Sequence, residues 1–163
     1  MIREQFSLFL QELLGQVRNC YGDRLVSLVV FGSVGRGSQR ADSDIDLLII
    51  AKGLPDGRLK RVGEFEAVEE ALEPSLLRLK ENGVATCLSP VLKSPPEVRR
   101  GSLLFLDMID DSLILYDRGG FFQSFLKDFK KRLTTLGARR VIRGNAWHWV
   151  LKKDYREGEV FEL

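Results

Sequence analysis

The stretch FGSVGRGSQRADSDIDL, residues 31–47, is the most informative part of this 163-residue chain. It follows residues 25–31, a run of β-branched and apolar residues that predicts a strand buried on both faces. Gly32 then begins a glycine-rich turn, in which Ser33 adds a hydroxyl donor. Because glycine has no Cβ, the backbone N–H groups of such a turn can approach an anion closely. The turn therefore predicts a phosphate-binding site at the end of the strand.

Two common phosphate-binding motifs are excluded by the residues that follow the turn. Gly32 and Gly37 have the glycine spacing of a Walker A loop, but Ser38 and Gln39 stand where that motif needs Lys followed by Ser or Thr. The dinucleotide motif G-x-G-x-x-G fails as well, because Arg40 takes the place of its third glycine. The sequence thus disfavours a Walker-type NTPase and a Rossmann cofactor site.

Asp44 and Asp46 open the second predicted strand, residues 44–51. Residues two apart on a strand share a face, with Cα atoms about 6.7 Å apart, so both carboxylates can converge on one site. Like charges this close repel each other, and the pair therefore calls for a cation. Two Mg²⁺ ions could be held there while they clamp a phosphate. The alternative is that Arg36 or Arg40 neutralises the pair at the strand end.

The rest of the chain alternates helical and strand patterns, which predicts an α/β fold with a mixed β-sheet flanked by helices. Pro74 is expected to interrupt a helix, and Pro90 places a strand at a sheet edge or a bulge. Gly144 and Asn145 are typical of a β-hairpin turn. Helices are predicted at 2–21, at about 58–72 with a shorter helix from there to 80, at 102–110 and at 121–136, and a further helix is predicted to start at 94–97. The further predicted strands are 84–92, 112–116, 139–142 and 146–151.

Length and charge indicate one compact unit with a basic end. With 44% apolar and 29% charged residues the composition is globular, and the net charge of +2 gives no overall field for nucleic acid or membranes. Residues 119–163 contain ten Lys or Arg and five Asp or Glu, a surplus of +5, which leaves −3 for residues 1–118. We expect residues 1–118 to form the main domain, with a C-terminal helix and basic β-hairpin, 119–163, packed on it.

The aromatic and sulfur-containing residues are assigned to packing. Strand alternation puts Trp147 and Trp149 on one face of the hairpin, where they are expected to pack against the last helix. Cys20 and Cys87 lack metal-ligand spacing and are expected in the core. The N-terminus has no signal-peptide pattern, and no apolar run approaches the roughly 20 residues of a membrane helix. We therefore expect no membrane association and a reducing, cytoplasmic location.

The turn and the acid pair together resemble a known family signature. Gly32-Ser33, ten further residues and Asp44-Ile45-Asp46 are similar to the Gly-Ser-x10-Asp-x-Asp pattern of the DNA-polymerase-β-like nucleotidyltransferase superfamily. The presence of Arg36-Gly37 and Ser43 within the stretch resembles the small stand-alone members, the minimal nucleotidyltransferases. The motif resemblance covers residues 25–51.

The resemblance implies Mg²⁺-dependent transfer of a nucleoside monophosphate, AMP in particular, from an NTP to an acceptor hydroxyl. Asp44 and Asp46 would be catalytic and would bind two Mg²⁺ ions, while Gly32 and Ser33 would hold the β- and γ-phosphates. It further implies ATP as the nucleotide and an antitoxin-like role in which a HEPN-type ribonuclease partner is adenylylated. The residues implied for nucleotide binding are Gly32, Ser33, Arg36, Gly37 and Ser43.

The sequence departs from the family pattern at the third carboxylate, which commonly lies on a following strand. Residues 84–92 contain no acid, and Ser89 is a weak substitute as a Mg²⁺ ligand or base. Two alternatives therefore stay open: a nucleotide-binding module with weak or no activity that acts by binding a partner protein, and an RNA-associated protein that uses the basic hairpin. Other acids that could approach the site, or simply lie on the surface, are Asp107, Asp110 and Asp111.

Overall fold

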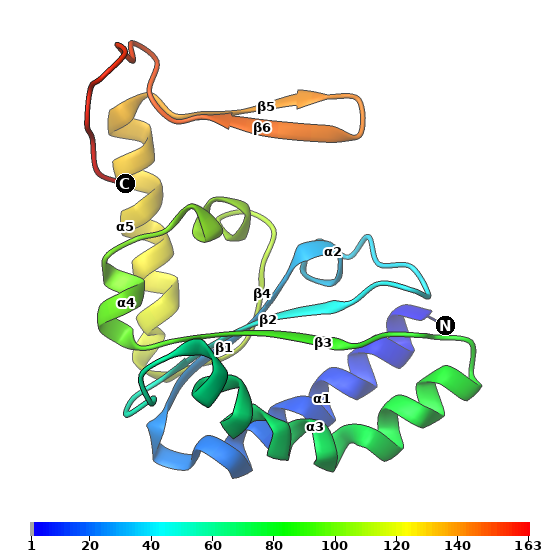
Figure 1. The fold of residues 1–163 in the computed structure, drawn as a ribbon. Coiled ribbons are helices and arrows are strands. Elements are labelled where there is room, and N and C mark those ends of the chain that lie inside the picture. Colours follow the sequence, from blue (N-terminus) through cyan, green and yellow to red (C-terminus); the bar gives the residue numbers. More distant parts are fainter. Residues whose placement is uncertain (1) are drawn as a thin grey trace.

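A computed structural model describes residues 2–163 and confirms the predicted α/β fold with a mixed sheet (Figure 1). The four strands of the main sheet have the order β3-β2-β1-β4. The second and third strands are parallel, and the first strand is antiparallel to both of its neighbours. These strands are β1 (Leu25–Phe31), β2 (Ile45–Ala51), β3 (Leu88–Lys93) and β4 (Leu113–Asp117).

Helices cover both faces of the sheet. One core contains alternate residues of β1 and β2 together with α1 (Ile2–Tyr21) and α3 (Arg58–Glu81), and the other core joins the opposite strand face to α5 (Phe121–Leu136). The two central strands are buried on both sides, which explains why they are almost continuously apolar. Among residues 2–163, no helix has both the length and the apolar character needed to cross a bilayer.

Three predicted elements differ from the structure in type or by more than one residue at an end. Pro74 does not interrupt its helix: α3 runs without a break, because buried Phe65, Val68, Leu72 and Leu79 hold it on the core on both sides of the proline. The third strand starts at Leu88 rather than 84, since Ala85 N–H donates to Ala41 O in the preceding loop. The helix predicted at 102–110 is a 3-10 helix, η2 (Leu103–Met108), whereas the start predicted at 94–97 is confirmed by α4 (Pro95–Arg99) and its capping box.

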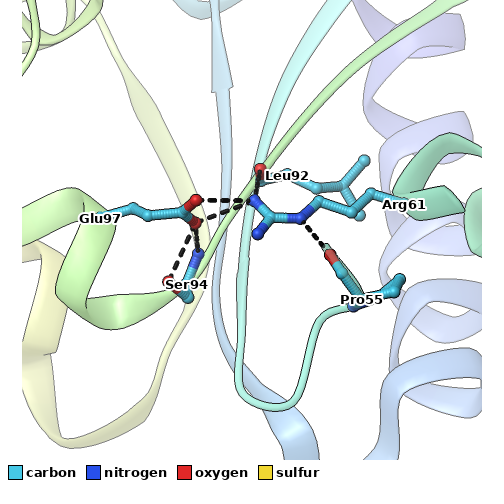
Figure 2. Close-up of polar contacts among 5 residues, drawn as sticks. All are labelled: Pro55, Arg61, Leu92, Ser94 and Glu97. Carbon is cyan, nitrogen blue, oxygen red and sulfur yellow. Dashed lines mark hydrogen bonds and ion pairs between the residues drawn. The ribbon is translucent and has the colours of Figure 1, made fainter. Parts of the chain in front are cut away.

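The outer edge of β3 is occupied by the Arg61 side chain, as Figure 2 shows, and by Pro90 of the strand itself. Arg61 donates to Leu92 O (3.2 Å), to Pro55 O (2.8 Å) and to Glu97 Oε2 (2.9 Å). Glu97 also accepts from the Ser94 N–H, which links α3, β3 and α4. Pro90, on the same strand, has no N–H to offer. The prediction that Pro90 marks an edge strand is confirmed.

Asp117, the last residue of β4, fixes α5 to the sheet. Its carboxylate accepts from the buried Ser27 hydroxyl (2.7 Å) and from the backbone N–H groups of Phe122 (2.9 Å) and Gln123 (3.0 Å). Acceptors at a helix N-terminus satisfy donors that the helix itself cannot pair. α5 leads into the predicted hairpin, β5 (Arg139–Arg143) and β6 (Ala146–Val150), which Figure 1 shows above the main sheet on the side of α2 (Gly32–Gly35).

Candidate active site

The glycine-serine turn forms α2, one helical turn directly after β1. Gly32 has a φ of +66°, a left-handed conformation that L side chains rarely adopt. A Cβ built on Gly32 would lie 2.1 Å from Asp46 Oδ2. The turn and the acid pair are therefore in direct contact, and only glycine allows this approach.

Asp44 and Asp46 lie at the N-terminal end of β2, beside the C-terminal end of β1, which leads into the turn. Asp46 is paired with Phe31 of β1 on one side and with Ser89 of β3 on the other. Asp44 precedes the strand, and its Oδ1 accepts from the Cys87 thiol at 3.0 Å. The structure thus brings the two acids to one site, next to the glycine-serine turn.

The electrostatics of this site are unfavourable without a cation. Burial, followed by the negative charge of Asp44, raises the pKa of Asp46, while a hydrogen bond from Ser89 and the charge of Arg36 lower it in part. Within residues 2–163, neither carboxylate takes part in an ion pair. Arg36 instead lies over the ring of Trp147, 4.9 Å from its centroid. The alternative in which an arginine simply neutralises the pair is not what the structure contains.

No acid occupies the place beside the pair on β3. Ser89 lies next to Asp46, and no group of three or more His, Cys, Asp or Glu side chains in the described part of the chain is arranged to hold a metal ion. The three other acids considered are engaged elsewhere. Asp107 accepts from Trp147 Nε1–H (3.0 Å), Asp111 pairs with Arg140 (2.7 Å) and Asp110 pairs with Lys130 (3.2 Å).

The two remaining predicted nucleotide-binding residues shape the loop between the turn and β2. Gly37 has a φ of +71°, and its carbonyl accepts from Arg3 at 2.9 Å. The Ser43 hydroxyl oxygen accepts from the Arg40 N–H at 2.8 Å, and the Ser43 carbonyl accepts from the Thr86 hydroxyl at 2.7 Å. Both residues hold the backbone that carries Asp44 into the site.

Two neighbours of the site were assigned to packing by sequence. Cys87 is exposed rather than in the core, and its hydrogen bond to Asp44 raises the pKa of the thiol to about 11. Trp149 packs into the core that contains α5, as predicted, but Trp147 contacts Arg36, Arg140 and Asp107 instead. Only the register of β3 against β2 and the docking of the hairpin identify these neighbours, and neither can be read from one sequence.

Comparisons with known proteins agree with this geometry. A family model described as nucleotidyltransferase domain matches residues 10–97, a range that includes the turn and the acid pair. A Methanocaldococcus jannaschii protein named "Putative protein adenylyltransferase MJ1305" is 30% identical over 132 residues, which make up 80% of this chain and 84% of that protein.

Two solved structures have a similar backbone at low identity. One is a toxin-antitoxin structure with AMP-PNP, which is 17% identical with a TM-score of 0.49 and covers 78% of this chain and 91% of its own. The other is the toxin-antitoxin MntA-HepT, which is 16% identical with a TM-score of 0.49 and covers 80% of this chain and 88% of its own.

Proposed function

Because the chain belongs to the nucleotidyltransferase-domain family, as its turn and acid pair predict, we propose that it transfers a nucleoside monophosphate from an NTP to an acceptor hydroxyl. The hydroxyl oxygen forms a bond to the α-phosphorus and releases its proton to solvent, the bond from that phosphorus to the bridging oxygen breaks, and pyrophosphate leaves. The observation that carries the proposal is the pair Asp44 and Asp46, which contacts the glycine-serine turn and, among residues 2–163, forms no ion pair with a cationic side chain.

The residues present fit a divalent metal. Asp44 and Asp46 offer hard carboxylate oxygens, and the raised pKa of Asp46 means that a cation there would relieve repulsion. Two Mg²⁺ ions at these acids would neutralise charge on the triphosphate during in-line displacement. Gly32 and Ser33 hold the β- and γ-phosphates through backbone N–H groups, and Arg36 binds the triphosphate from the other end of the turn.

ATP and a protein acceptor are the finer parts of the proposal. The name of the Methanocaldococcus jannaschii relative supports both, since an adenylyltransferase that acts on proteins moves AMP. A HEPN-type ribonuclease partner is the acceptor that the sequence resemblance implies. In this scheme residues 1–118 form the nucleotidyltransferase domain, and α5 with the hairpin, 119–163, is an appendage packed on it.

One observation favours a second candidate. Because Ser89 rather than an acid lies beside Asp46, the same site could hold a nucleotide with little turnover while the protein acts by binding a partner. Multiple-turnover release of pyrophosphate in the presence of acceptor would exclude this version. Mg²⁺-dependent ATP binding without pyrophosphate release would support it.

Labelling with [α-³²P]ATP tests the main proposal. The wild-type protein, Mg²⁺ and a cell extract should give a labelled macromolecule, and the double variant Asp44→Asn, Asp46→Asn should not. Asp42→Asn is the matched control, because Asp42 is an exposed acid of the same loop and should leave labelling intact. Equal labelling by the double variant would rule out the assigned site.

A further inference from the structure

The ring of Trp147 in β6 is contacted by two arginine side chains from distant parts of the chain. The guanidinium carbon of Arg36 is 4.9 Å from the indole centroid, and that of Arg140 is 5.6 Å away. Both distances fall within the roughly 6 Å at which a cation is attracted to an aromatic face. The hairpin therefore touches the residue that the proposed function assigns to the triphosphate.

The position of Trp147 is fixed by polar contacts as well as by stacking. Its Nε1–H donates to Asp107 of η2 at 3.0 Å, and the neighbouring Arg140 pairs with Asp111 at 2.7 Å with both side chains largely shielded from solvent. The loop that holds Asp111 lies close to α2, because a Cβ on Gly35 would be 2.8 Å from Asp111 O. The hairpin is thus docked on the segment that borders the glycine-serine turn.

The two faces of the hairpin are different. Trp147 is paired with Ile142 and Trp149 with Arg140, so these four side chains share one face, and Trp149 packs into the core. Val141 is paired with His148 on the opposite, outward face, and His148 is exposed. Trp147 is therefore on the inner face, and His148 provides an outer-face control one residue away.

We propose that Trp147 is a positioning residue that holds Arg36 in the orientation needed to bind the triphosphate; this inference rests on the proposed function. A guanidinium held over an aromatic ring by a cation–π contact can still donate its N–H groups to phosphate oxygens. An exposed arginine loses side-chain freedom on binding a ligand, and an arginine already held by the ring loses less. The hairpin residue would then strengthen binding of triphosphates without contacting them.

Binding of ATP with Mg²⁺ and binding of AMP, measured by calorimetry, test this role. Trp147→Leu and Trp147→Phe both lose the Nε1–H, but only Phe keeps an aromatic face. We expect Trp147→Leu to weaken ATP binding about three- to tenfold, the range of a partly shielded cation–π contact. The same variant should change AMP binding less than twofold. Trp147→Phe should keep most of the wild-type affinity for ATP, and His148→Ala should bind ATP as the wild type does. The unfolding temperature of each variant confirms that it is folded.

A double-variant cycle with Arg36→Ala tests whether the effect passes through Arg36. Trp147→Leu should add no further loss of ATP affinity once Arg36 is removed. Three outcomes would overturn the positioning role: independent losses of ATP affinity in the cycle, equal weakening of ATP and AMP binding, or ATP binding by Trp147→Phe as weak as that by Trp147→Leu. Each of them indicates that Trp147 contacts the nucleobase or only supports the fold. If the wild-type protein binds no ATP in the presence of Mg²⁺, the proposed function itself fails and the positioning role fails with it.

Discussion

Two partly buried carboxylates near opposite ends of β3 have opposite environments. Glu97 accepts from the Arg61 guanidinium and from the Ser94 backbone N–H, and these bonds lower its pKa to about 2 (Figure 2). Asp46 lies beside Ser89 at the start of the strand. Burial and the negative charge of the nearby Asp44 raise its pKa. The charge of Glu97 is compensated by its own partners, whereas a cation beside Asp46 would relieve the repulsion between the two acids.

This difference separates structural from functional acids. A carboxylate with two charge-assisted partners stabilises the fold at neutral pH, whereas a pair of acids with no cationic partner costs stability unless a ligand compensates for it. Acids of the second kind, with a raised pKa, gather at functional sites. The comparison therefore predicts that removing Glu97 harms the fold, and that removing Asp46 harms the activity.

The largest expected effect is on the reaction. Asp46→Asn should lower kcat/KM for pyrophosphate release by about 100-fold or more, since it removes a ligand for the metal that stabilises transition-state charge. Glu97→Gln should leave kcat/KM within about twofold of the wild type at a temperature where it is folded. Steady-state kinetics with ATP and acceptor measure both, and similar losses in the two variants would contradict the contrast.

The contact between the turn and the acid pair gives the next largest effect. Gly32→Ala should lower activity about 100-fold. The new Cβ would lie 2.1 Å from Asp46 Oδ2, so the carboxylate would have to move out of the site. Gly83→Ala is the matched control: Gly83 also has positive φ and lies outside the site, and a Cβ there meets nothing within 4 Å. Both variants should lose about 1–2 kcal/mol of stability from the left-handed backbone. Denaturant melts and activity assays separate the two effects.

Acid titration tests the Glu97 site. Because the folded pKa of Glu97 is lowered from 4.5 to about 2, its stabilisation is present above about pH 4.5 and is lost as the pH falls towards 2. Glu97→Gln should reduce the free energy of unfolding at pH 7 by about 1–2 kcal/mol, as expected for hydrogen bonds to a charged group. The difference from the wild type should shrink below pH 4.5. Urea unfolding at several pH values gives the comparison, and a difference that does not vary with pH would contradict it.

The smallest expected effect is a gain in stability at the acid pair. In the presence of EDTA, Asp46→Asn should raise the free energy of unfolding at pH 7 by about 0.5–1 kcal/mol, because it removes the repulsion between neighbouring acids. Added Mg²⁺ with ATP should raise the unfolding temperature of the wild type but not that of the variant. Thermal melts with and without Mg²⁺ are sufficient, and destabilisation of the variant in EDTA would mean that Asp46 supports the fold as Glu97 does.

Much of the site could be predicted because it depends on local rules. Strand alternation predicts that Asp44 and Asp46 converge, and they do so although β2 begins only at Ile45. The glycine at position 32 marks a backbone that side chains rarely adopt. The order of the strands depends on pairing between distant segments, which no local pattern specifies. Cys87 is therefore identified as a neighbour of Asp44 only by the structure, whereas the family resemblance had already pointed to Ser89 in place of a third acid. Pro74 shows the limit of local propensity, because packing on both sides keeps α3 continuous.

The outer edge of β3 also limits how this molecule can assemble. A strand from another chain that aligned with that edge would meet a proline without a donor and a Leu92 carbonyl already bonded to Arg61. Backbone pairing of copies along β3 is therefore blocked, and the apolar sheet does not act as a template for edge-to-edge aggregation there. A protein that docks on this side has to recognise side chains, so its specificity can change without any alteration of the sheet.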